Sequence, residues 1–172
     1  MKIKYHLAII FLASFASGCA STSGSHNLLS ESPGHAQTAN FKELVILVKP
    51  APGIQLYQGE EDRISKRIAR IIKTEAPDRF KNINPSLISP NTLQATVVMT
   101  QYEKGSSFTR ILLDGLGQIH IDADVTISDY ASKDTLAKHE VTKTFAWGGT
   151  ASIYDAEEGF SKAVAEAILG KD

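Results

Sequence analysis

The sequence predicts an α+β fold: a largely antiparallel sheet of about four strands with two amphipathic helices on one face. Two segments with apolar side chains at helical spacing, residues 60–75 and 153–168, predict the helices. Residues 118–129 alternate strictly between apolar and polar side chains, and a short turn joins them to a further strand over 135–147. The expected order of elements is therefore β-α-β-(short helix)-β-β-α.

The first half of the domain is predicted to hold two strands with a helix between them. Residues 41–49 form a continuous apolar run, which is typical of a buried strand. The helix over 60–75 has isoleucines at positions 64, 68, 71 and 72 on one face, and acidic residues in its first turn, where the helix dipole favours negative charge. An irregular connection over 82–90 leads to a strand over 92–103.

The second half is predicted to hold the short helix, within residues 104–117, and then the two paired strands. In the strand over 118–129, the odd-numbered apolar side chains face the core. The same parity in the next strand puts His139 and Lys143 among apolar side chains. We expect a bulge there, an edge position, or side chains that reach out past the core.

The N-terminus has the pattern of a bacterial lipoprotein signal. Two lysines precede an apolar run over residues 7–16, and small side chains then lead to Cys19, the only cysteine of the chain. The run is shorter than the about 18 residues expected of a spanning helix. We therefore expect residues 1–18 to be a signal peptide and Cys19 to be acylated. The alternatives are an ordinary secreted protein or an uncleaved anchor.

Residues 19–40 are then the acylated cysteine and a flexible tether, because the segment after the cysteine is rich in serine, glycine and alanine and lacks apolar periodicity. Its typical reach is about 25 Å. Residues 41–172 have a normal size for a single α+β periplasmic domain. Ala20 and Ser21, rather than aspartate, follow the cysteine, which favours the periplasmic face of the outer membrane over the inner membrane.

The charge balance argues against a polyanionic partner. Loss of Lys2 and Lys4 from the 18 basic residues leaves 16 against 19 acidic ones, so the mature chain has a net charge of −3. We expect no nucleic acid. The expected partners are the membrane, through the lipid on Cys19, and an unknown envelope protein or peptidoglycan component. A homo-oligomer is an alternative.

The polar side of the first helix is a candidate binding surface. It carries five basic residues: Arg63, Lys66, Arg67, Arg70 and Lys73. A basic amphipathic helix can dock on anionic headgroups or on an acidic partner. The alternative is a solvated helix face on which Asp62 and Lys66 form an i, i+4 ion pair.

Three residues on one strand face have side chains suited to metal binding or acid–base chemistry: His120, Asp122 and Asp124. They span about 13 Å along a strand, so one metal ion could not bind all three without other ligands. The common hydrolase and nucleotide-binding motifs are absent from the sequence. We therefore expect no metal, no cofactor and no enzymatic activity; a hydrolase would need His120 or His139 to meet a nucleophile in a cleft.

Residues 93–169 resemble the bacterial lipoproteins grouped as domain of unknown function 4410. The matching features, in order, are Tyr102-Glu103-Lys104-Gly105 at a strand end, Arg110, Leu113-Asp114-Gly115-Leu116-Gly117, the strand closing at Asp129, and Gly148-Gly149 before the last helix. The turn at Ser132-Lys133-Asp134 departs from the family, which more often has Thr-Gly-Lys. The resemblance implies secretion and a shared fold but no reaction.

These observations predict a non-enzymatic binding or adaptor module of the cell envelope. The alternative is a structural subunit that adds an exposed strand edge, that of the strand over 135–147, to copies of itself or to another envelope protein.

Overall fold

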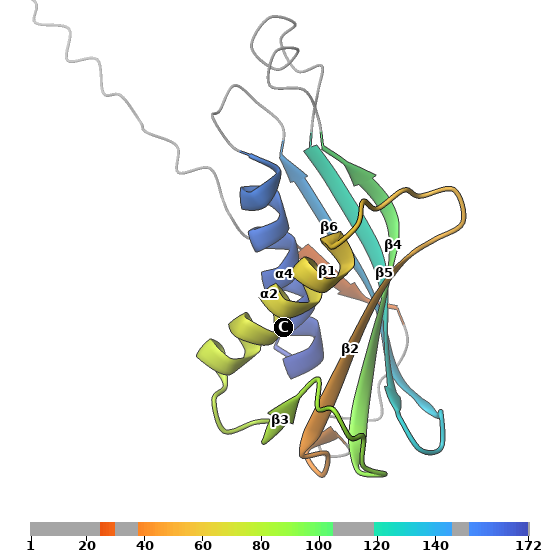
Figure 1. Ribbon diagram of the computed structural model, residues 1–172, viewed down its shortest axis with the longest axis vertical. Coiled ribbons are helices and arrows are strands. Elements are labelled where there is room, and N and C mark those ends of the chain that lie inside the picture. Colours follow the sequence, from red (N-terminus) through yellow and green to blue (C-terminus); the bar gives the residue numbers. More distant parts are fainter. Residues whose placement is uncertain (1–24, 30–37, 105–118, 146–151, 172) are drawn as a thin grey trace, which may run out of the picture.

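The computed structural model describes residues 25–29, 38–104, 119–145 and 152–171. It is an α+β domain in which both helices cover the same face of one sheet (Figure 1). The elements are β1 (Ser25–Leu28), β2 (Glu43–Pro50), α2 (Glu60–Glu75), β3 (Asn82–Ile83), β4 (Thr92–Glu103), β5 (Ile119–Asp129), β6 (Thr135–Phe145) and α4 (Ile153–Leu169). Within the described ranges, no helix has the length and apolar character needed to cross a membrane.

The predicted sheet of about four largely antiparallel strands is wrong, because the sheet has six strands and is mixed. The strand order is β1-β6-β5-β4-β2-β3. β2 runs parallel to both of its neighbours, β4 and β3, whereas β4, β5, β6 and β1 form antiparallel pairs. The connection from β2 to β4 contains a helix, which brings the chain back to the same end of the sheet, and such a crossover joins parallel strands.

β1 lies in the segment for which the sequence predicts a flexible tether. It pairs antiparallel with β6 and therefore covers the β6 edge over residues 139–142. The His26 ring lies 3.0 Å from the carbonyl oxygen of Lys171, just beyond α4, and meets the His139 ring edge-on with centroids 5.7 Å apart. The tether prediction therefore does not hold for residues 25–28, and β1 covers part of the β6 edge on which the alternative of a structural subunit depends.

The hydrophobic core lies between the inner face of the sheet and the two helices. The odd-numbered side chains of β5 face this core, as the alternation predicts. His139 and Lys143 also lie on this inner face, with relative exposures of 7% and 5%, and burial lowers the pKa of Lys143. No bulge occurs at these two residues, because the β5–β6 register shifts between Ile127 and Ser128 instead.

The buried face of α2 and the two ends of α4 can be explained by their sequences. All four predicted isoleucines of α2 are buried. α4 begins after Ser152, whose backbone N–H donates to the Asp155 carboxylate at 2.7 Å, and it ends at Gly170, which has a φ of 66°. α2 and α4 pack against each other, which brings the charged face of α2 next to the first turns of α4.

Candidate functional site

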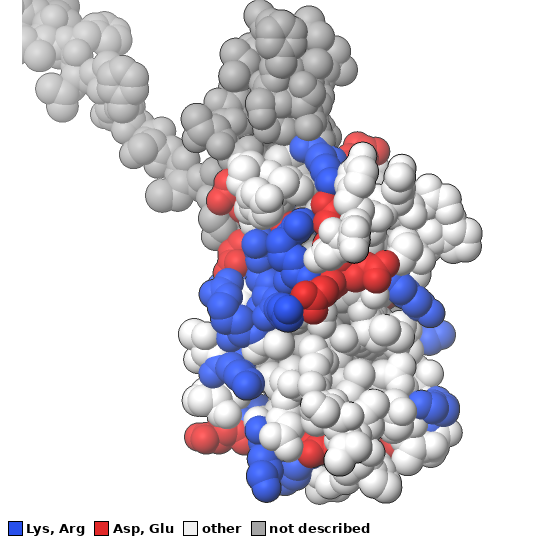
Figure 2. All heavy atoms as spheres, in the orientation of Figure 1, with Lys and Arg blue, Asp and Glu red and all other residues white. Residues whose placement is uncertain are grey.

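The five basic residues predicted on α2 divide into two groups. Arg63 and Arg67 turn toward α4, with side chains that are 33% and 16% exposed. Lys66, Arg70 and Lys73 are exposed on the outward face, and Figure 2 shows Lys and Arg side chains gathered over α2. Only the second group therefore forms a basic surface.

The two inward-facing arginines form ion pairs with Glu157, a fully buried carboxylate on α4. Arg63 binds it with two nitrogens, Nη2 at 2.5 Å from Oε1 and Nε at 3.1 Å from Oε2. Arg67 Nη1 lies 3.3 Å from Oε2, and the Tyr102 hydroxyl donates to Oε1 at 2.5 Å. Each carboxylate oxygen thus has two partners, which offset the cost of burying the charge.

Glu60, the first residue of α2, extends this network toward the surface. Its carboxylate accepts hydrogen bonds from the Tyr57 backbone N–H at 2.7 Å and is ion-paired to Lys104 Nζ at 2.7 Å. Arg63 Nη2 lies 3.5 Å from Glu60 Oε1. Burial acts to raise the pKa of Glu60, but Lys104, the Tyr57 N–H and Arg63 together outweigh it, so the pKa is lowered.

The same contacts keep Arg63 and Tyr102 in their protonated forms. The hydrogen bond to Glu157 raises the pKa of Arg63. Burial, and then the hydrogen bond to Glu157, raise the pKa of Tyr102, so its hydroxyl stays protonated and keeps donating. We call Glu60, Arg63, Arg67, Tyr102, Lys104 and Glu157 the α2–α4 charge cluster. Its charges are paired with one another, so the cluster joins α2, α4 and the end of β4 rather than presenting a reactive base.

The outward-facing basic residues of α2 line an open hollow of ≈ 590 Å³ between this helix and β3. Its lining residues are Asp62, Lys66, Ala69, Arg70, Lys73, Thr74, Ile83 and Asn84. Lys66 pairs with Asp62 at 2.7 Å, the i, i+4 pair that the sequence predicts, and Arg70 pairs with Glu158 of α4 at 2.7 Å. Among the described residues, Lys73 has no ion-pair partner. We call this the α2 hollow, and three exposed basic side chains line it.

A second open hollow, of ≈ 380 Å³, lies where the segment before α2 meets the end of β4. Tyr57, Tyr102 and Lys104 line it together with Gln101 and Glu103. Lys104 Nζ lies 4.0 Å from the centre of the Tyr57 ring and 5.7 Å from that of Tyr102. Both distances are within the range of cation–π contacts, which hold the two rings around the lysine.

The predicted histidine and aspartates are only partly brought together. His120 Nε2 lies 2.7 Å from Asp122 Oδ2, and its Nδ1 lies 2.7 Å from the Thr144 hydroxyl on β6. This is a hydroxyl–imidazole–carboxylate chain, but it lies on the outer face of the sheet and lines neither hollow described above. Asp124 instead stands directly opposite Glu140. In the described ranges, no group of three metal-ligating side chains comes together.

Several predicted features lie outside the described residues. These are the signal peptide, Cys19, most of the tether, the short helix within 104–117, and the glycine pair before α4.

The sequence comparison decides the family. The family model named Domain of unknown function (DUF4410) matches residues 60–149, which is more than half of the chain. The chain belongs to this family. The DUF4410 match spans α2 to β6 and includes five of the six residues of the charge cluster: the three on α2 and the two at the end of β4. No curated protein is significantly similar to the chain.

The solved structures to which the chain is similar include bacterial proteins. A PelC dodecamer from Paraburkholderia phytofirmans matches 85% of this chain and 96% of its own, with a TM-score of 0.59 and 10% identity. A point variant of that protein, with the same coverage and identity, gives a TM-score of 0.57. Uncharacterized lipoprotein B from Nitrosomonas europaea matches 75% of this chain and 80% of its own, with a TM-score of 0.37 and 16% identity. At these identities, the PelC likeness shows a shared fold.

Glu157, the buried carboxylate of the charge cluster, is the residue that the sequence predictions missed. Glu157 lies four residues after Ile153 and three before Phe160, so helical spacing puts it on the apolar stripe of α4. A carboxylate on such a stripe is a signal of a buried ion pair. Its partners could not be found in this way, because they lie on α2 and β4, far away in the sequence.

Proposed function

We propose that this protein is a lipoprotein, anchored through Cys19 on the periplasmic face of the outer membrane, that acts as a non-enzymatic binding or adaptor module. The N-terminal signal pattern, with Cys19 directly after a short apolar run, supports the anchor. The family is one of unknown function and assigns neither a reaction nor a partner.

The α2 hollow is the observation that carries the binding role. Lys66, Arg70 and Lys73 line it, and it is open to solvent beside β3. Charged groups on such a surface favour encounter with a partner of opposite sign. The partner is therefore an acidic surface of another envelope protein. Arg63 and Arg67 do not take part, because they are held by Glu157.

The arrangement of the titratable groups supports a non-enzymatic role. The carboxylates of the charge cluster are neutralised by their own partners. The His120 chain lies on a strand face and lines neither of the two hollows described above, whereas a catalytic group acts in a hollow that holds the substrate and excludes water.

A capture experiment tests this function. The mature domain is immobilised, exposed to a detergent-solubilised envelope extract of its host, and the retained proteins are identified by mass spectrometry. Lys66→Glu with Lys73→Glu should abolish retention of the specific partner. The matched control, Lys49→Glu with Lys138→Glu, reverses two exposed charges on the sheet and should leave retention unchanged. Equal retention by both double variants would remove the α2 hollow as the binding site.

Self-assembly is a second candidate, favoured by the dodecamers formed by PelC, which has a similar fold. β1 covers the β6 edge over residues 139–142, and the two outermost strands of the sheet in the described part of the chain, β1 and β3, have four and two residues. Short edge strands are a common protection against edge pairing. Contacts between copies would therefore use the faces of the domain. Light scattering on the acylated protein in detergent distinguishes a monomer from an oligomer.

A further inference from the structure

β1 determines the end of the domain from which the N-terminal segment leaves. Through the register of β6 and β5, Ser25 lies in the same row of the sheet as Gln101, near the end of β4 at Glu103. Leu28 lies in the row of Val97, nearer the start of β4. The chain therefore enters β1 from the end of the sheet at which β4 finishes. We call this the Glu103 end, and the opposite one the Thr92 end.

The segment between the predicted anchor and β1 is short. Five residues separate Cys19 from Ser25. Fully extended, they reach at most about 21 Å, and a flexible chain of this length typically spans about 13 Å. The rows of Gln101 and Thr92 are about 30 Å apart along β4. While β1 is paired, the anchor therefore keeps the Glu103 end within about 21 Å of the bilayer, which excludes an orientation in which the Thr92 end faces the membrane and the Glu103 end points away.

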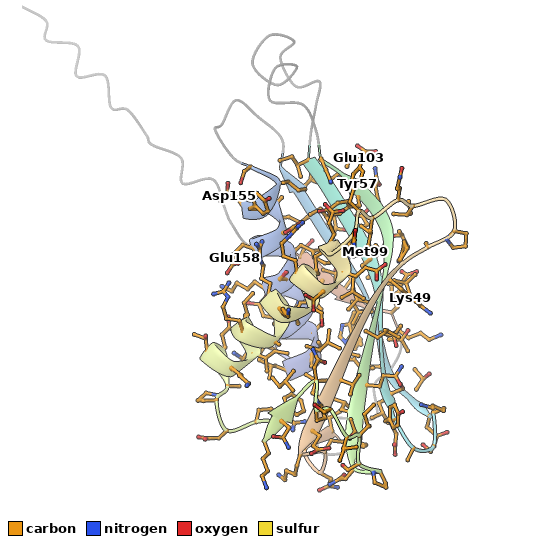
Figure 3. All side chains as sticks on the ribbon, in the orientation of Figure 1. Lys49, Tyr57, Met99, Glu103, Asp155 and Glu158 are labelled. Atoms are coloured by element: carbon orange, nitrogen blue, oxygen red, sulfur yellow. The ribbon has the colours of Figure 1, made fainter. Side chains whose placement is uncertain are left out.

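The Glu103 end also carries exposed aromatic side chains. Tyr57 is 61% exposed, and Figure 3 shows it beside Glu103 at this end of the sheet. Tyr154 is 55% exposed and lies in the first turn of α4, next to Asp155, which Figure 3 places at the same end. Tyrosine is enriched at membrane–water interfaces, because its ring is apolar and its hydroxyl is polar.

We propose that the Glu103 end rests on the lipid bilayer, with Tyr57 and Tyr154 at the level of the headgroups, and that the Thr92 end points away from the membrane. This rests on the proposed lipid anchor at Cys19. Two independent observations carry it: the direction in which the chain enters β1, and the position of the two tyrosines. Residues 25–28 serve as a strap that fixes this orientation, held by β6 and by the contact of His26 with Lys171.

Fluorescence quenching on vesicles tests the orientation. The acylated full chain is reconstituted into phosphatidylethanolamine–phosphatidylglycerol vesicles that contain a lipid with a nitroxide on its headgroup. Because acylation consumes the Cys19 thiol, an introduced cysteine is the only one that takes a fluorophore. Gln58→Cys puts the label beside Tyr57 at the Glu103 end, and the matched control Leu87→Cys puts it at the Thr92 end, where Leu87 is 88% exposed.

Quenching should be several-fold stronger for the Gln58→Cys label than for the Leu87→Cys label. Adding Tyr57→Ser and Tyr154→Ser to Gln58→Cys should weaken that quenching, while circular dichroism shows an unchanged fold. Equal quenching at both positions, or stronger quenching at Leu87→Cys, would overturn the proposed orientation. Failure of the acylated preparation to float with the vesicles is a separate result, which would overturn the lipid anchor and the orientation together.

Discussion

Replacing Glu157 with glutamine tests whether the charge cluster holds the two helices together. The change keeps the size of the side chain but removes the charge that faces Arg63 and Arg67. Arg63 loses a two-pronged ion pair with contacts of 2.5 and 3.1 Å, and Arg67 loses one at 3.3 Å. The Tyr102 hydroxyl keeps an acceptor in the amide oxygen. The change in the free energy of unfolding therefore reports the loss of the ion pairs more than a loss of packing.

Removal of one partner of a buried ion pair costs about 3–5 kcal/mol. The Arg63 side chain is one-third exposed and can turn partly to water, so we expect the lower end, about 3 kcal/mol. For a domain of this size, 1 kcal/mol corresponds to about 2–4 °C in Tm, so Tm should fall by about 10 °C. The double replacement Arg63→Met with Glu157→Met should cost less than the sum of the single changes, because it removes both charges of the Arg63–Glu157 pair together.

The assay is urea denaturation of the mature chain, followed by circular dichroism. Glu166→Gln on the same helix is the matched control, because Glu166 is partly exposed and forms only an i, i+4 contact of 3.8 Å with Lys162. Its cost should stay below about 0.5 kcal/mol. A Glu157→Gln loss of less than about 1 kcal/mol, or one equal to the control, would refute the reasoning.

Further predictions concern the hydrogen bond that ties the segment after β3 to β2, the stability of the protein at low pH, and catalysis. Asn84→Ala should lower the free energy of unfolding by about 2 kcal/mol, because the Asn84 carboxamide oxygen accepts the Ile46 N–H at 2.7 Å; an unchanged urea midpoint would contradict this. The folded-state pKa of Glu60 lies below its ordinary value of 4.5, so the stability it contributes is present above pH 4.5 and is lost as pH falls through the folded pKa. The stability difference between the wild type and Glu60→Gln should therefore shrink below pH 4.5, and a constant difference would argue against it. Hydrolysis of p-nitrophenyl acetate should be no faster for the wild type than for His120→Ala, and a rate that drops in this variant would show that the chain to Thr144 is catalytic.

The parts of the fold that repeat a pattern over many residues could be predicted from the sequence. Both helices and the alternating strand β5 lie where their periodicity places them. β1 and β3 could not be predicted, because they have four and two residues and are held by pairing with distant strands. The parallel pairing of β2 with β4 had an available signal: a strand, a helix and a strand in succession is the arrangement of a parallel crossover.

The candidate site shows the same limit. Helical spacing identifies Arg63 and Arg67 as polar residues on one side of α2, but it does not say what they face. Their partner Glu157 is 94 residues from Arg63 in the sequence. Lys66 and Lys73 remain on the surface, and among the described residues neither forms an ion pair with α4. Tertiary packing therefore decides which basic residues stabilise the fold and which are available to a partner.

The lipid anchor at Cys19 is the claim on which both the location and the orientation depend. The most direct test is mass spectrometry of the N-terminal peptide of the protein, extracted with detergent from outer membranes of its own host. The account predicts a chain that begins at Cys19 and carries acyl chains. A chain that begins elsewhere, with an unmodified Cys19 thiol, would contradict it.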